Sequence, residues 1–144
     1  MNLREFYLEL SVLFGYLQSF TLLFIRLAVA YGFYEPSMIK WANLEVTATW
    51  FRELGIPLST FFAFVTASFE LIGVVLLVAG LFTRLISVPL IIIMIIAILT
   101  VHLANGFSAG ANGIEIPLYY LLFLSILATH GAGKFSLDEI FNHE

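Results

Sequence analysis

The feature that most constrains the fold is a long uncharged stretch that contains a single carboxylate. Apart from Glu70 near its middle, residues 57–83 carry no charged side chain. At about 1.5 Å per residue, a helix of this length spans the roughly 30 Å hydrocarbon core of a bilayer. Glu70 would then lie about 20 Å from either end, where an ionised side chain is costly. The stretch therefore predicts a membrane-spanning helix in which Glu70 needs a partner.

Small residues indicate which way Glu70 points. Those on or beside its helical face are Ala63, Thr66, Ala67, Gly73 and Gly80, with Val74 and Leu77 as larger exceptions. Small residues let helix backbones approach one another, whereas bulky apolar residues suit lipid. Glu70 is therefore predicted to face the interior of a helix bundle.

The composition indicates a membrane protein. Of its 144 residues, 61% are hydrophobic and 11% are charged, against about 25% charged in average globular proteins. The net charge of −4 argues against a nucleic-acid partner. The absence of cysteine excludes disulfides and cysteine-ligated iron–sulfur clusters within the chain. We expect residues 1–144 to form one transmembrane domain in contact with lipid.

Four apolar stretches are predicted to span the membrane: residues 10–34, 57–83, 85–103 and 114–130. They are too long and too evenly apolar for barrel strands, so the predicted fold class is all-α, a four-helix transmembrane bundle. Four spans place both termini on one side, and the basic residues slightly favour the cytoplasmic side of a cell (inner) membrane. A cleavable signal peptide ending near Ala30 is the alternative, but Glu5 and Glu9 oppose it because such leaders begin net positive.

Residues 35–56, between the first two spans, are too polar to cross a membrane. Their apolar residues at helical spacing are Trp41, Leu44, Ala48 and Phe51. Pro36 suits an early helical position, and the Gly55–Pro57 sequence suits a stop. The pattern favours an amphipathic interfacial helix that caps the bundle. A solvated linker helix is the alternative.

Four ionisable residues lie within or at the edge of the predicted spans: Arg26, Glu70, His102 and Glu115. Because successive spans alternate in direction, the four are predicted to descend from the membrane face beneath residues 35–56 toward the midplane. Tyr119, one turn after Glu115, could join them. A structural interpretation is that Arg26 and Glu70 form an ion pair that fixes helix register.

The functional interpretation is a polar pocket open to lipid. Glu70 and Glu115 would accept protons there, and His102 would donate a hydrogen bond or shuttle a proton, as catalytic residues. Arg26 would keep the carboxylates ionised and, with Tyr119, contact the ligand. A quinone head group would suit this arrangement.

Metal and haem sites are less consistent with the sequence. Glu70, His102 and Glu115 are possible metal ligands, but they follow no spacing motif and Arg26 would oppose a cation. His102 and His130 lie at opposite faces, about 25 Å apart, so they cannot share a haem iron. No metal, haem or iron–sulfur cluster is expected within the chain.

Spaced residues along positions 26–138 form a recognisable pattern. They are Arg26 and Gly32; Leu54–Pro57; Glu70, Gly73 and Gly80–Arg84; Ala97, His102, Gly106 and Phe107; Asn112, Gly113 and Glu115; and Gly131, Gly133, Ser136 and Asp138. In order and spacing this pattern resembles the DoxX family of small four-helix membrane proteins. The family pattern would place a lysine at position 35, where this chain has Glu35, and a lysine follows only at Lys40.

The resemblance implies a link to quinone-coupled oxidoreductases, including a thiosulfate:quinone oxidoreductase subunit. The favoured function is a quinone- or lipid-binding subunit of a membrane oxidoreductase, with electrons supplied by a redox partner protein. The alternative is a non-catalytic membrane scaffold or assembly subunit whose buried charges fix helix packing. The expected protein partner is a redox protein or further copies of the chain in a homo-oligomer. A proton or solute carrier is less favoured because four short spans leave little room for discontinuous helices.

Overall fold

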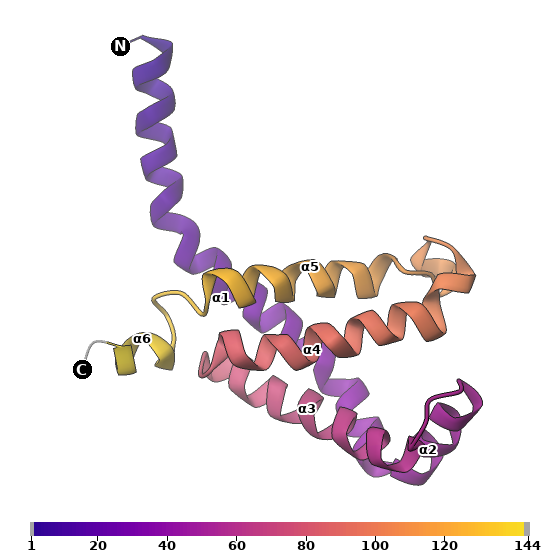
Figure 1. Ribbon diagram of the computed structural model, residues 1–144. Helices are drawn as coiled ribbons and strands as arrows, with labels where there is room; N and C mark the ends of the chain where they lie inside the picture. Colours follow the sequence, from indigo (N-terminus) through magenta and orange to yellow (C-terminus); the bar gives the residue numbers. More distant parts are fainter. Residues whose placement is uncertain (1, 143–144) are drawn as a thin grey trace.

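The computed structural model describes residues 2–142, and every regular element in that range is helical. The main helices are α1 (Leu3–Ala42), α2 (Leu44–Glu53), α3 (Ser59–Ala79), α4 (Thr83–Ala97), α5 (Glu115–His130) and α6 (Leu137–Asn142). A π-helical turn, η1 (Ile98–His102), and two 3₁₀ turns, η2 (Leu103–Asn105) and η3 (Ala109–Ala111), connect α4 to α5. Figure 1 shows α2 and α6 at opposite ends of the molecule. The all-α prediction is confirmed for the described residues.

Within residues 2–142, three helical segments are long and apolar enough to cross a membrane: α1, α3 and the continuous segment Thr83–Asn105. Helix α5 is also apolar but has 16 residues, a length of about 24 Å. The helices lie close to the predicted spans, because long apolar runs bounded by glycine and polar turns leave few alternatives to a helix in lipid.

The core lies where α1, α3, α4 and α5 meet. Its buried members are Leu22, Val29, Ala30, Phe33, Leu77, Ile86, Leu90, Leu124 and Leu127. Glycine brings α3 and α4 together at one point, since a Cβ on Gly73 would lie 2.9 Å from the Leu90 Cδ1 atom. The outer surface carries large apolar side chains such as Ile72 and Val88. A bundle that is apolar both inside and outside matches a lipid environment.

Helix α1 is longer than the sequence predicted. Pro36 lies inside α1, which continues to Ala42. The helix therefore does not end at Tyr34, the predicted end of the first span, and residues 35–42 extend α1 instead of starting a separate helix. Membrane helices tolerate proline because nearby hydroxyls and neighbouring helices satisfy the distorted backbone. Here the Ser37 hydroxyl donates to the Tyr34 carbonyl at 2.7 Å.

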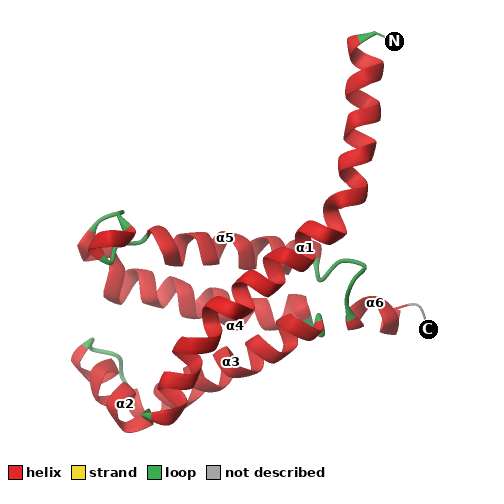
Figure 2. Ribbon diagram, turned by 180° about the vertical axis from the view of Figure 1, so that it is seen from behind, coloured by secondary structure: helices red, strands yellow, loops and turns green. Residues whose placement is uncertain are grey.

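The N-terminal part of α1 leaves the other helices. Leu22 is the first buried residue of α1 and Ser37 the last, so the packed part is shifted toward the C-terminus relative to the predicted 10–34. Figures 1 and 2 show the preceding segment projecting beyond the bundle, at the end where α6 lies.

Helix α2 packs on α3 through part of the predicted apolar stripe. Ala48 and Phe51 are buried against Ala63 of α3, with Ile56 beside them. Residues 44–53 alone form this helix, so the segment predicted as one interfacial helix is divided between α1 and α2.

The C-terminal segment closes the opposite end of the bundle. The Asp138 carboxylate accepts the backbone N–H groups of Phe82 and Thr83 at 2.7 and 3.0 Å, which caps the start of α4. The Asp138 N–H donates to the Gly80 carbonyl at 2.9 Å. These three bonds attach α6 to the tight turn between α3 and α4.

Candidate functional site

Glu70 is buried inside the protein and paired with Lys40. The Lys40 Nζ atom lies 2.8 Å from Glu70 Oε2 and 3.1 Å from Oε1. The Glu70 residue is 2% exposed, so the prediction that it faces protein is confirmed. Both carboxylate oxygens have the same cationic partner, which offsets the cost of burying the charge.

The predicted Arg26–Glu70 ion pair is wrong. The Arg26 guanidinium instead donates to the carbonyl oxygens of Leu77, Ala132 and Phe135 at 2.8, 2.9 and 3.0 Å. The cause is the continuation of α1 through Pro36. Fourteen residues of helix separate Arg26 from Lys40, about 21 Å along the axis, so Lys40 reaches Glu70 while Arg26 lies toward the α6 end.

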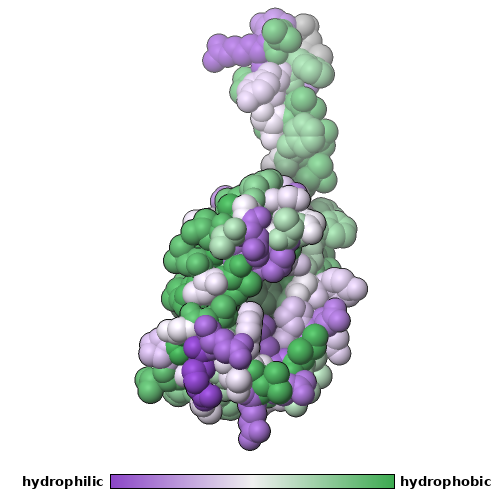
Figure 3. All heavy atoms as spheres, turned by 90° about the vertical axis from the view of Figure 1, so that its right-hand side faces the viewer, coloured by the Kyte–Doolittle hydropathy of each residue, from purple (hydrophilic) through white to green (hydrophobic). Residues whose placement is uncertain are grey.

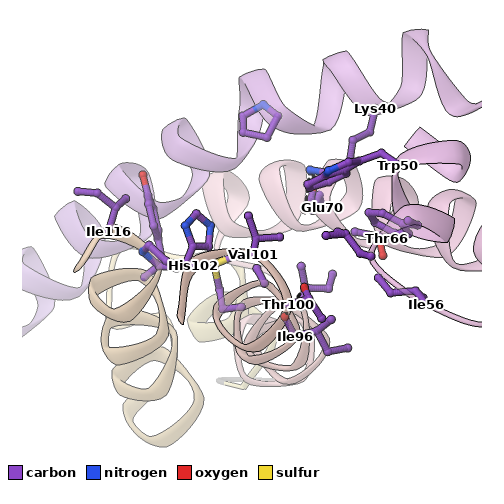
Figure 4. Close-up of a pocket in the computed structure, with 18 of the residues that line it drawn as sticks. Lys40, Trp50, Ile56, Thr66, Glu70, Ile96, Thr100, Val101, His102 and Ile116 are labelled. Carbon is purple, nitrogen blue, oxygen red and sulfur yellow. Dashed lines mark hydrogen bonds and ion pairs between the residues drawn. The ribbon is translucent and has the colours of Figure 1, made fainter. Parts of the chain in front are cut away.

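A cavity of about 700 Å³ lies beside the Lys40–Glu70 pair. Most residues lining it are apolar, and those with polar side-chain atoms are Lys40, Trp50, Thr66, Glu70, Thr100, His102, Asn112 and Tyr120. Figure 4 shows Lys40, Trp50 and Glu70 on one side of the cavity and His102 and Ile116 on the other. Figure 3 views the α2 end of the molecule and shows hydrophilic residues gathered there. An apolar cavity of this size with a few polar groups is typical of small-molecule sites.

His102 ends the π-helical turn and lines the cavity. Its Nδ1 atom lies 2.9 Å from the Asn112 carbonyl oxygen. Since a carbonyl can only accept, this bond assigns the proton to Nδ1 and leaves Nε2 as the accepting nitrogen of the neutral ring. Single π-helical turns occur frequently at functional sites.

Glu115 and Tyr119 do not line the cavity with Glu70. Glu115 Oε2 accepts the Ala109 N–H at 2.9 Å, and the Tyr119 hydroxyl lies 3.3 Å from Glu115 Oε1. These contacts hold the glycine-rich connection 103–113 against the start of α5. Of the five predicted site residues, the structure therefore places Glu70 and His102 at the cavity and Arg26, Glu115 and Tyr119 elsewhere.

Comparison with known proteins identifies the family. The DoxX family model matches residues 21–103, more than half of the chain. The chain belongs to the DoxX family. A relative, "Putative oxidoreductase CatD" of Bacillus subtilis (strain 168), is 36% identical over 89 residues, which cover 62% of this chain and 65% of that protein. No solved structure matches.

The part of this DoxX protein that matches the family model includes Lys40, Glu70 and His102. Sequence reasoning did not assign Lys40 and Tyr120 to the site. A signal for Lys40 was present, because Gly32, Pro36 and Lys40 follow one another at four-residue spacing. A helix that continued through Pro36 would place all three on one face, and all three line the cavity.

Proposed function

We propose that this DoxX protein is the membrane-embedded, quinone-binding subunit of an oxidoreductase system. The observation that carries the proposal is the Lys40–Glu70 ion pair beside an otherwise largely apolar cavity of about 700 Å³. The Lys40 side chain is 19% exposed, so its ammonium is not sealed from a ligand. The relative named as an oxidoreductase supports the redox assignment.

The proposed membrane arrangement is a four-helix bundle. The packed part of α1, with α3, α4 and α5, would cross the membrane, and α2 would lie in the interface at the cavity end. Exposed apolar residues such as Phe62 and Ile96 border the cavity, which supports entry of a lipid-soluble ligand from the side. Both termini would lie on the cytoplasmic side of the cell (inner) membrane.

The proposed chemistry assigns a role to three of the polar residues that line the cavity. Lys40 would donate a hydrogen bond to a quinone oxygen, and Glu70 and His102 would deliver or accept protons. Reduction of the quinone to quinol takes two electrons and two protons. The electrons would come from a partner oxidoreductase, because this chain contains no cysteine for dithiol chemistry.

The test is binding of a water-soluble, short-tailed 1,4-benzoquinone to the detergent-solubilised protein. Trp50 lines the cavity, so saturable quenching of tryptophan fluorescence is the expected signal. Lys40→Met should weaken binding by about tenfold, since a hydrogen bond to a charged group contributes about 1.5–3 kcal/mol. Glu70→Gln should also weaken it, because the ammonium loses the charge that positions it.

The matched controls are Lys134→Met and Glu53→Gln, which change exposed side chains and should leave binding unchanged. If the wild-type protein shows no saturable quenching, the quinone-binding proposal is wrong. The Lys40–Glu70 pair would then only fix helix packing, as in the scaffold alternative.

A further inference from the structure

The hydroxyl group of Tyr120 occupies a notch in α1 that exists because residue 32 is glycine. A Cβ atom at Gly32 would overlap the Tyr120 hydroxyl oxygen. The Tyr120 ring also meets the Phe33 ring edge to face, with centroids 5.7 Å apart. Two adjacent residues of α1, Gly32 and Phe33, therefore hold the Tyr120 side chain in place. Gly32, Phe33 and Tyr120 all line the cavity.

Tyr120 has hydrogen-bonding capacity that the protein does not use. Among residues 2–142, its hydroxyl has no hydrogen-bond partner, whereas the neighbouring Tyr119 hydroxyl contacts Glu115. Tyr120 is partly buried beside the core, and a tyrosine hydroxyl can both donate and accept a hydrogen bond. A rigidly held phenol without a protein partner at a cavity wall is available to a ligand.

Tyr120 lies toward the opposite end of the cavity from the Lys40–Glu70 pair. Its contact on α1, Gly32, precedes Lys40 by eight residues, about 12 Å along the helix. On α5, Tyr120 is one turn after Ile116 and shares its face. Figure 4 shows Ile116 and His102 across the cavity from Lys40 and Glu70. The cavity thus has Lys40 toward one end and Tyr120 toward the other, and most of the residues that line it are apolar.

We infer that Tyr120 is the second ligand-binding donor and that the cavity selects rings with oxygens at two opposite positions. Such a ring, a 1,4-quinone, can accept from Lys40 at one oxygen and from Tyr120 at the other. A lipid whose head group has one oxygen can use only one of these donors and binds at the charged end. This inference rests on the proposed function, to which it adds a second ligand-binding residue.

The experiment compares two ligands of equal tail length. One is a decyl-substituted 1,4-benzoquinone, which has two carbonyl oxygens, and the other is a decyl-substituted cyclohexenone, which has one. Quinone binding is measured by tryptophan quenching and cyclohexenone binding by displacement of the quinone. Tyr120→Phe keeps the ring contact with Phe33 and should weaken quinone binding about fivefold, the worth of one net hydrogen bond. It should leave cyclohexenone binding unchanged.

Tyr119→Phe is the matched control and should change neither affinity. Gly32→Ala, which displaces the Tyr120 hydroxyl, should weaken quinone binding as Tyr120→Phe does. The inference is overturned if Tyr120→Phe binds the quinone as tightly as wild type, or if wild type binds both ligands equally. In both cases the proposed function survives provided that Lys40→Met still weakens quinone binding. Absence of quinone binding by wild type overturns both.

Discussion

The two ends of the bundle each bury a charged side chain, but they use it differently. At the α6 end, Arg26 is 1% exposed and each of its three guanidinium nitrogens donates to a backbone carbonyl oxygen. At the α2 end, Glu70 is paired with Lys40, and the pair borders a cavity. Burial of a charge in a membrane helix therefore does not identify a site. A site is identified by the partners of the charge and by the space beside it.

The Arg26 end is suited to holding structure together. The planar guanidinium offers five donors in a fixed geometry, and here it joins α1 to the last turn of α3 and to the C-terminal segment. A cation at a helix C-terminus is also favoured by the helix dipole. Gly80 makes the approach possible, because a Cβ there would overlap the Arg26 guanidinium. The guanidinium at this end is therefore used by the protein itself.

The Lys40–Glu70 end is suited to binding. A lysine has a compact charge with three rotatable donors on a flexible stem, so it can stay bonded to the carboxylate and still donate to a ligand oxygen. The cavity residues around it come from helices α1 to α5 and the turns between them. Hydrogen bonds to His102 and Glu115 hold the connection 103–113 in place. The site is therefore formed in advance and needs no large rearrangement.

The largest expected effect is at Arg26. Arg26→Met should lower the free energy of unfolding by about 3–5 kcal/mol, since buried carbonyl oxygens lose a charged partner that methionine cannot replace. The measurement is the melting temperature in detergent. Arg52→Met, at an exposed position of α2, is the control. A melting temperature close to wild type for Arg26→Met would contradict a structural role for this residue.

A smaller effect is expected at Asp138. Asp138→Ala removes the cap of α4 and should cost about 1–2 kcal/mol, while Asp138→Asn should cost less because the amide oxygen still accepts. Limited proteolysis should cut the C-terminal segment faster in Asp138→Ala than in wild type. Quinone affinity should be unchanged in both variants. A loss of affinity would mean that the two ends of the bundle are coupled.

The smallest effect on stability is expected at His102. His102→Ala loses the bond to the Asn112 carbonyl and should cost at most about 1 kcal/mol. It should nevertheless weaken quinone binding, because the imidazole is the proposed proton donor or acceptor on that side of the cavity. His130→Ala, in the exposed last turn of α5, is the control. If His102→Ala binds the quinone as wild type does, His102 only supports the connection 103–113 through its bond to Asn112.

The sequence alone determined the helices and the direction of Glu70. Long apolar runs have few alternatives to a helix in a bilayer, and small residues around Glu70 marked the face that packs against other helices. Both features depend on local spacing, which a sequence displays directly. Ser136 and Glu139 also have the local spacing of a helix start, and the Glu139 N–H donates to the Ser136 hydroxyl at 3.3 Å.

Only the tertiary structure decided which cation forms an ion pair with Glu70. Whether α1 stops before Pro36 or continues through it changes the depth of every later residue, and proline permits both outcomes in a membrane helix. Continuation places Lys40 at Glu70 and leaves Arg26 at the other end. The cavity and the notch for Tyr120 depend in turn on how α1 and α5 pack side by side. Such contacts join residues far apart in the chain, so no local pattern could specify them.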